Sequence, residues 1–175
     1  RNQYGQLGLD PGTTAWTSTP TAVSAVPISG GISGVAAFGG TSCYVISGLR
    51  RCMGLNSSGE FGMNSTTNSW VPTPSPVPTT SLVDAILEGG VGFACGFPRI
   101  PPDVTYGKIS CWGNDASGQL GLAAGYTRQS CGGAPCVINA TVNPLPQPQY
   151  GAAPINGSAG RWDVGSAHVC AQTWA

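Results

Sequence analysis

The sequence predicts an all-β protein built from short strands, and three observations support this fold class. The 175 residues include 27 glycines and 15 prolines, about twice the usual combined share, and both residue types interrupt helices. Brief apolar runs bounded by glycines, such as residues 35–38 and 43–46, are typical of strands in small antiparallel sheets. A glycine-containing motif also recurs at long intervals, which indicates a repeated structural unit.

The composition excludes several classes of function. Charged residues make up 8% of the chain, against about 25% in an ordinary globular protein. The formal net charge is zero and Lys108 is the single lysine, so no basic face is expected and nucleic-acid binding is excluded. No apolar run approaches the roughly 18 residues of a membrane span, so we expect no membrane insertion by this segment.

The repeated motif is a glycine turn that occurs in three copies, at residues 2–9, 56–63 and 115–122. The two glycines of each copy are Gly5 and Gly8, Gly59 and Gly62, and Gly118 and Gly121. The first glycines of successive copies are 54 and 59 residues apart. We expect these glycines to form tight turns with positive φ, which other residues resist.

A second signature, which ends in a cysteine, recurs between the turns at residues 40–43, 92–95 and 167–170. Short strands repeated with a period of 50–60 residues point to propeller blades rather than to helical solenoids. A stack of irregular β-modules is the alternative. The expected units are residues 1–54, which lack a first strand, then 55–113, and then 114–175, which are incomplete at the C-terminal end.

Two short segments carry a family resemblance. Residues 111–114 (Cys-Trp-Gly-Asn) and 118–121 (Gly-Gln-Leu-Gly) resemble the repeat of the regulator of chromosome condensation family. The resemblance covers nearly the whole chain as three repeats. It implies about three blades of a β-propeller that typically has seven four-stranded blades, and hence a fragment of a longer chain. The cysteine-containing repeats are most similar to secreted or receptor-ectodomain members of the family.

The cysteines fall on successive predicted strands. In the first two repeats, the cysteine of the second signature is followed by another on the return strand, which pairs Cys43 with Cys52 and Cys95 with Cys111. Facing positions in a hairpin put Cβ atoms about 4.5–5.5 Å apart, close to the spacing of a disulfide. We therefore expect both pairs to be disulfide-bonded, with buried free thiols as the alternative.

The three remaining cysteines differ in context. Cys131 and Cys136 bracket a short Gly-Gly-Ala-Pro segment and are expected to close a small surface loop. Cys170 is left over, and by the repeat pattern its partner lies outside the chain. Zinc sites require paired short spacings, and no second pair accompanies Cys131 and Cys136, so no metal site is predicted.

Four N-glycosylation sequons begin at Asn56, Asn64, Asn139 and Asn156. Together with the expected disulfides and the scarcity of lysine, they favour a secreted glycoprotein that is extracellular or at the cell surface. Attached sugars would also supply the solubility that charged residues do not.

Catalytic groups are scarce in this sequence. His168 is the single histidine, it has no nucleophile elbow beside it, and its repeat position points to blade packing. The acidic residues have no distinctive context for acid–base chemistry, and the glycine-rich stretches lack the lysine of a phosphate loop. We therefore predict neither enzyme activity nor a cofactor.

Aromatic residues offer a possible binding function. Trp16, Trp70 and Trp162 could form stacking platforms for sugars or anchors for a protein. Trp112 is expected to fill a blade core instead. Trp16 and Trp70 each lie 11 residues after the first turn glycine of their repeat, so they could also clamp loops against neighbouring blades.

The predicted function is a noncatalytic extracellular β-propeller module that acts as a structural or protein–protein interaction scaffold. Its expected partner is a protein or an extracellular assembly. A carbohydrate-binding, lectin-like module is one alternative. A receptor ectodomain and an intracellular GTPase-regulating propeller are further alternatives, and both are implied by the family resemblance alone.

Overall fold

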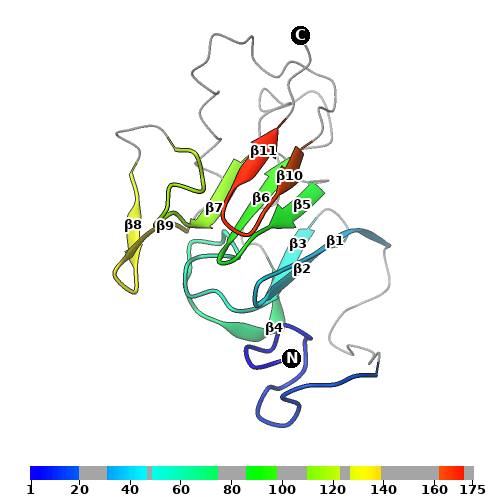
Figure 1. The fold of residues 1–175 in the computed structure, drawn as a ribbon. Helices are drawn as coiled ribbons and strands as arrows, with labels where there is room; N and C mark the ends of the chain where they lie inside the picture. The colour runs from blue at the N-terminus through cyan, green and yellow to red at the C-terminus, as the bar shows by residue number, and fades with distance from the viewer. Residues whose placement is uncertain are drawn as a thin grey trace.

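The computed structural model describes residues 1–19, 31–46, 49–74, 86–97, 110–122, 127–138 and 162–171. These residues form eleven strands in antiparallel sheets and contain no helix (Figure 1). The predicted all-β fold class is confirmed. Within the same residues, no helix with the length and apolarity needed to cross a membrane is found.

The first sheet is an antiparallel meander in chain order. Its strands are β1 (Ile32–Phe38), β2 (Thr41–Ile46), β3 (Leu49–Gly54) and β4 (Ser69–Pro74). A two-residue turn joins β1 to β2, and in it Gly39 has a φ of 55°, a conformation that glycine adopts without steric cost. The meander places Cys43 of β2 directly opposite Cys52 of β3.

The second sheet repeats this plan and adds one strand. Its strands are β5 (Ile86–Gly89), β6 (Phe93–Phe97), β7 (Ser110–Asn114), β8 (Gln129–Cys131) and β9 (Ala134–Val137), in the spatial order β5-β6-β7-β9-β8. Strands β5 to β7 correspond to β1 to β3, and β9 pairs with β7 as β4 pairs with β3. Strand β8 forms a hairpin with β9 at the outer edge and has no counterpart in the first sheet.

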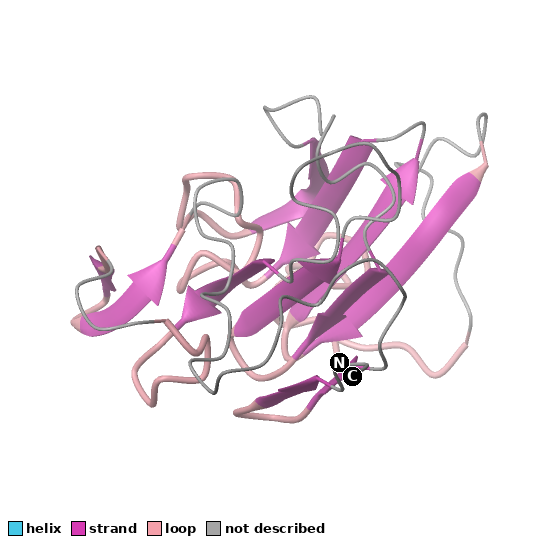
Figure 2. Ribbon diagram, turned by 90° about the horizontal axis from the view of Figure 1, so that it is seen from above, coloured by secondary structure: helices cyan, strands magenta, loops and turns pink. Residues whose placement is uncertain are grey.

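The third sheet is described as the hairpin of β10 (Trp162–Val164) and β11 (Val169–Ala171). The first strands of the sheets are neighbours, since β5 lies next to both β1 and β10. The backbone N–H of Val91 also donates to Ser166 O at 2.9 Å, which links the second sheet to the third. Figure 2 shows the sheets from above, with loops joining the strands.

One buried hydrophobic cluster joins the first two sheets and the turn between them. It contains Phe38, Cys43, Val45, Cys52, Phe61, Met63, Phe93, Ala94, Cys95, Cys111, Trp112, Leu120 and Val137. The inner strands are buried on both faces, because adjacent residues such as Cys111 and Trp112, which point to opposite faces of the sheet, both belong to the cluster. The sheets therefore stand side by side and share their cores.

The sheets do not coincide with the repeat units expected from the sequence. The expected boundaries follow Gly54 and Gly113, but β4 pairs with β3 and β9 pairs with β7 across those boundaries. Each of the two later expected units begins just before a glycine turn, and this turn lies between the third and fourth strands of a sheet. Each of the first two sheets therefore draws strands from two of the expected units.

Candidate functional site

The glycine turns are organised by the first residue of each motif. Its side-chain Oδ1 accepts a hydrogen bond from the backbone N–H five residues later, at 2.8, 2.8 and 2.9 Å in the three copies. The residue pairs are Asn2 with Leu7, Asn56 with Phe61, and Asp115 with Leu120. An Asn or Asp at this position closes the turn onto its own backbone.

The six turn glycines all have the left-handed backbone expected from the sequence. Their φ values are 78° at Gly5, 71° at Gly8, 80° at Gly59, 62° at Gly62, 71° at Gly118 and 62° at Gly121. In each copy the second glycine donates its N–H to the carbonyl of the first, at 2.8–3.0 Å. A side chain at these positions would strain the backbone, because L-residues avoid this region.

The side-chain amide in the first two copies is replaced by a guanidinium in the third. Asn2 Nδ2 donates to the carbonyls of Leu9 and Thr14, at 3.0 and 2.7 Å. Asp115 has no such donor, and there Arg128 supplies one. Arg128 Nε donates to Asp115 Oδ2 at 2.5 Å, and Arg128 Nη2 donates to Leu122 O at 3.3 Å.

The replacement of the side-chain amide by the Arg128 guanidinium can be tested with a double variant. Arg128→Met leaves the fully buried Asp115 carboxylate without its cation, so we expect a loss of about 2 kcal/mol in the free energy of unfolding. Adding Asp115→Asn to the same chain should restore most of that loss, because the amide then donates as Asn2 does. Urea denaturation of the two single variants and the double variant measures this coupling. Additive losses would show that the two side chains act independently.

One of the predicted glycosylation sites, Asn56, is a buried residue of its glycine turn. Asn56 is fully buried, and its Nδ2 donates to Ser65 O at 2.9 Å and to Thr67 O at 3.1 Å. A glycan on this nitrogen would replace those hydrogen bonds and need space that the fold fills. Asn56 is therefore a structural residue of the turn.

Of the other three sequon asparagines, the structure describes Asn64. Asn64 is exposed at the end of the second glycine turn, with a φ of 56°. Asn139 and Asn156 lie outside the described residues. A usable sequence signal separates Asn56 from Asn64, because Asn56 opens the repeated turn motif at the position of Asn2 and Asp115, whereas Asn64 lies after it.

The position after the first turn glycine carries a second structural side chain. Gln6 Oε1 accepts from Tyr4 N at 3.0 Å, and Gln119 Oε1 accepts from Ser117 N at 2.9 Å. Glu60 takes this role in the second copy, where its Oε2 accepts from Ser58 N at 2.8 Å. Its other oxygen, Oε1, is buried without a hydrogen-bond partner.

The pKa of Glu60 responds to this environment. Burial raises the pKa of Glu60 above its ordinary value of 4.5, against a smaller lowering by backbone hydrogen bonds at Glu60 and Ser58. The folded protein thus holds the proton more tightly than the unfolded chain does. The contribution of Glu60 to stability is therefore most favourable at acid pH, and it falls as the pH rises from about 4.5 through the folded-state pKa of Glu60.

Glu60→Gln should remove this pH dependence. The glutamine keeps an oxygen for Ser58 N, as in the other two copies, and buries no charge. We expect an increase of about 1 kcal/mol in the free energy of unfolding at pH 7, and little change at pH 4. Urea denaturation at both pH values tests this prediction, with Gln119→Glu as the reciprocal variant. An equal effect of Glu60→Gln at the two pH values would contradict it.

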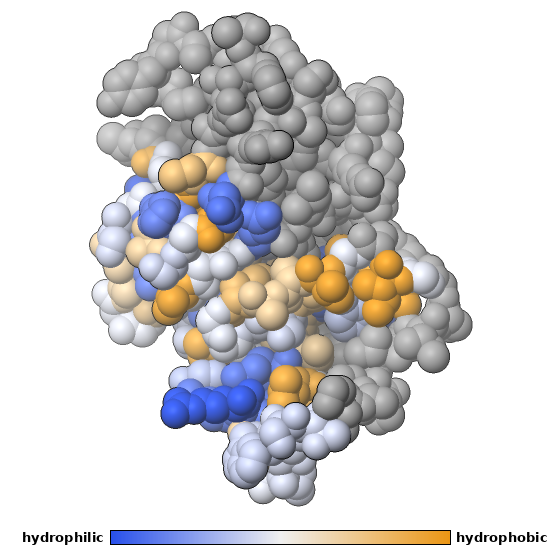
Figure 3. All heavy atoms as spheres, turned by 45° about the vertical axis from the view of Figure 1, so that its right-hand side comes forward, coloured by the Kyte–Doolittle hydropathy of each residue, from blue (hydrophilic) through white to orange (hydrophobic). Residues whose placement is uncertain are grey.

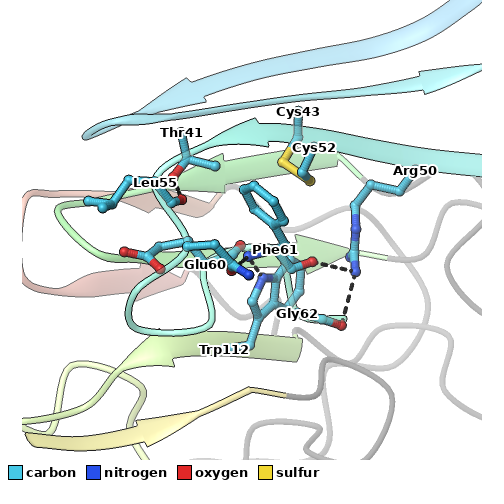
Figure 4. The surroundings of a disulfide bond; sticks show 10 residues. Thr41, Cys43, Arg50, Cys52, Leu55, Glu60, Phe61, Gly62 and Trp112 are labelled. Carbon is cyan, nitrogen blue, oxygen red and sulfur yellow. Dashed lines mark hydrogen bonds between the residues drawn. A yellow bond between two sulfur atoms is a disulfide. The ribbon is translucent and has the colours of Figure 1, made fainter. Parts of the chain in front are cut away.

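The junction between the first two sheets is built around Trp112 (Figure 4). The indole Nε1 of Trp112 donates to Glu60 O at 2.8 Å. Arg50, 3% exposed, lies with its guanidinium carbon 4.6 Å from the centroid of the Trp112 ring. Arg50 Nη2 also donates to Phe61 O at 2.9 Å. A residue from each sheet and the turn between them thus meet at one buried point.

Arg50 is a structural residue that the sequence-based predictions missed. Burial lowers the pKa of Arg50 to about 10, and its Nε and Nη1 have no hydrogen-bond partner. The cation–π contact with Trp112 therefore compensates for part of the desolvation. Strand alternation offers a usable signal, because Arg50 lies two residues before Cys52 and so shares its inward face.

The three expected disulfides are present. Cys43–Cys52 joins β2 to β3 and Cys95–Cys111 joins β6 to β7, with Cα–Cα distances of 4.2 and 4.1 Å. All four of these cysteines are at most 3% exposed. Cys131–Cys136 closes the β8–β9 hairpin, with a Cα–Cα distance of 5.9 Å. Cys170 is free and exposed, and it lies on β11 opposite Asp163.

Four large apolar side chains of the described residues are exposed. Trp16 is 70% exposed, Val35 75%, Val91 65% and Ile32 46%. Figure 3 shows apolar surface interrupted by polar surface over the face in view. Trp70 is the second residue of β4, and Trp162 is the first residue of β10. The side chains of both residues lie outside the described set. Of the three aromatic candidates, Trp16 is thus the exposed one whose side chain is described.

The described residues contain no arrangement suited to catalysis. His168 is exposed, its ring packs over Gly165, and no hydrogen bond joins that ring to a nucleophile or a carboxylate in these stretches. Burial and the neighbouring Asp163 raise the pKa of Glu88. The described stretches contain no group of three or more side chains that could hold a metal ion.

Antiparallel sheets of this plan, with their first strands side by side, define the blades of an RCC1-type β-propeller, and solved structures share this fold. Human WBSCR16 is similar at 19% identity with a TM-score of 0.52, over 78% of this chain. Yeast RCC1 (Prp20) bound to Kap60 is similar at 14% identity with a TM-score of 0.55, over 85% of this chain. Saccharomyces cerevisiae Prp20p, studied for its binding to Gsp1p and histones, is similar at 14% identity with a TM-score of 0.57, over 85% of this chain.

This likeness concerns the fold and part of each propeller. The chain spans 33% of the WBSCR16 structure, and 29% and 30% of the two Prp20 structures. No model of a known protein family matches the chain, and no curated protein matches it. The prediction of a partial propeller is confirmed at the level of the fold.

Proposed function

We propose that this chain is a noncatalytic part of an extracellular β-propeller that serves as a scaffold for binding another protein. The observation that carries the proposal is the set of three disulfides, one across the inner strands of each complete sheet and one in the outer hairpin. Disulfides of this structural kind form and persist in oxidising compartments and are rare in the cytosol. The fold thus suits secretion or the cell surface.

The proposed contact surface is the β8–β9 hairpin, which the first sheet lacks. Its two-residue tip, Gly132 and Gly133, has φ values of 60° and 92°, as a tight hairpin turn requires. The Cys131–Cys136 disulfide closes the hairpin behind this tip. Gln129, Ser130 and Pro135 are exposed on it. A rigid projecting element loses little conformational entropy on binding, which favours recognition of a protein.

The similar yeast structures support a protein as the partner class. Prp20p has been studied for binding to Gsp1p and histones, and Prp20 has been solved in complex with Kap60. Propellers of one fold serve unrelated partners, so the likeness supports the kind of interaction rather than the identity of the partner.

The test of compartment is the redox state of the cysteines in the native protein. Cells producing the full protein are quenched with a thiol-alkylating reagent, and the peptides are analysed by mass spectrometry without reduction. We expect three linked pairs and secretion into the medium or display at the surface. Free Cys43, Cys52, Cys95 and Cys111 in an intracellular pool would reject the extracellular assignment and favour the GTPase-regulating alternative.

A second candidate function is carbohydrate binding, which the exposure of Trp16 favours. A flat indole that is 70% exposed can stack on a sugar ring. A glycan array with the wild-type protein and Trp16→Ala tests this function, with Val91→Ala as the control for loss of an exposed apolar side chain. Binding that disappears only in Trp16→Ala supports the lectin-like function, and no binding on the array rejects it.

A further inference from the structure

Two sequons lie eight residues apart in the segment that joins β3 to β4. Asn56-Ser57-Ser58 opens the second glycine turn, and Asn64-Ser65-Thr66 follows its end. The two asparagines share one stretch of chain and the same exposure to any modifying enzyme before folding. Their surroundings in the folded protein are opposite.

Asn56 is incompatible with a glycan because its side chain is the centre of the turn. Its Oδ1 accepts from Phe61 N at 2.8 Å, while both hydrogens of Nδ2 are given to backbone carbonyls. Its exposed fraction is 0%. A chain modified at Asn56 could not form this turn, and the turn also supplies the Glu60 carbonyl that Trp112 contacts.

Asn64 combines a fixed backbone with an available side chain. Its N–H donates to Ile138 O at 2.8 Å, which ties it to the end of β9 in the second sheet. The residue is exposed, and its φ of 56° is one that asparagine tolerates better than most residues. Thr66, whose hydroxyl completes the sequon, is also exposed.

We propose that Asn64 is an N-glycosylation site and that Asn56 is not. This inference rests on the proposed extracellular function, because the donor is an oligosaccharide carried on a lipid diphosphate in the secretory pathway. Asn64 Nδ2 forms a bond to C1 of the first sugar, the bond from C1 to the phosphate oxygen breaks, and the lipid diphosphate leaves with the electron pair. The nitrogen loses one proton in this step.

The position of Asn64 gives the glycan a structural consequence. The hydrogen bond to Ile138 O places the attachment point where the segment before β4 meets the end of β9. Strand β4 lies beside β3 on the side away from β2, and β9 lies beside β7 on the side away from β6. The sugar thus covers the outer seam between the first two blades. It adds polar surface to a chain with 8% charged residues.

The experiment compares two variants that each destroy one sequon without changing its asparagine. Thr66→Ala removes the Asn64 sequon, and Ser58→Ala removes the Asn56 sequon while keeping the Ser58 N–H that Glu60 accepts. The full protein is secreted from eukaryotic cells, treated with peptide:N-glycosidase in heavy-oxygen water, reduced and digested with chymotrypsin. Cleavage after Phe61 puts Asn56 and Asn64 on separate peptides, and labelled Asp marks each residue that carried a sugar.

We expect the label at position 64 in the wild type and in Ser58→Ala, and complete loss of it in Thr66→Ala. Position 56 should stay unlabelled in all three proteins. An unlabelled Asn64, or a label at Asn56 in folded protein, overturns the inference. If that protein is secreted with its three disulfides, the extracellular proposal stands and only the glycan site fails. Retention inside the cell with free thiols overturns both.

Discussion

Replacing Trp112 by alanine should lower the free energy of unfolding by about 3–5 kcal/mol. Trp112 is 1% exposed and belongs to the core shared by the first two blades. Its loss leaves a cavity, and it also leaves the Glu60 carbonyl without the indole N–H and the Arg50 guanidinium without its aromatic face. Chemical denaturation under oxidising conditions measures the effect.

Two control variants separate the contributions to this loss. Trp112→Phe keeps an aromatic ring but removes the N–H, so we expect a smaller loss of about 1–2 kcal/mol. Val91→Ala truncates an apolar side chain that is 65% exposed and should change stability by less than about 0.5 kcal/mol. A loss below about 1 kcal/mol for Trp112→Ala would show that the blades do not depend on this junction.

Removing the buried disulfide of the second blade is the other large effect. The double variant Cys95→Ala and Cys111→Ala should lose about 2–5 kcal/mol of unfolding free energy relative to the oxidised wild type. The bond joins β6 to β7 at directly opposite positions, and both cysteines are 0% exposed. Without the bond, the unfolded chain gains the freedom of a loop whose ends are 16 residues apart.

The outer hairpin provides the matched comparison. Cys131 and Cys136 are 5 residues apart, so the chain-entropy contribution of their bond is smaller by roughly 1 kcal/mol. We therefore expect Cys131→Ala with Cys136→Ala to be the milder double variant in the same denaturation experiment. Adding a reductant should bring the wild type close to the cysteine variants. The reverse order of the two double variants would contradict the chain-entropy argument.

The strands and turns were predictable because local geometry specifies them. Glycine at a position that requires positive φ and alternation along a strand both act within a few residues. The pairing of Cys43 with Cys52 follows from the same alternation, since a hairpin places facing residues within reach of a bond. Repetition strengthened each of these predictions, because the same signals recur in the three copies.

The blade boundaries and the added hairpin could not be predicted in the same way. In each of the first two blades, the strand after the glycine turn pairs with the strand before it. The segment between the turn and this last-paired strand is longer in the second blade, where β8 precedes β9. Which strand joins a sheet after a long connection depends on tertiary packing rather than on local signals. Residue composition alone does not distinguish β8 from an ordinary loop.

By itself the sequence determined the all-β class, the repeated turns, the facing cysteines and the scarcity of catalytic groups. The tertiary structure decided the roles of individual polar residues. Asn56 and Asn64 begin identical types of motif, yet one is buried in its turn and the other is exposed. Arg50 lies in the core and Arg128 replaces an amide because each faces a neighbouring segment that closes only when the chain folds. Burial and partners depend on packing between distant segments, so local patterns specify them only in part.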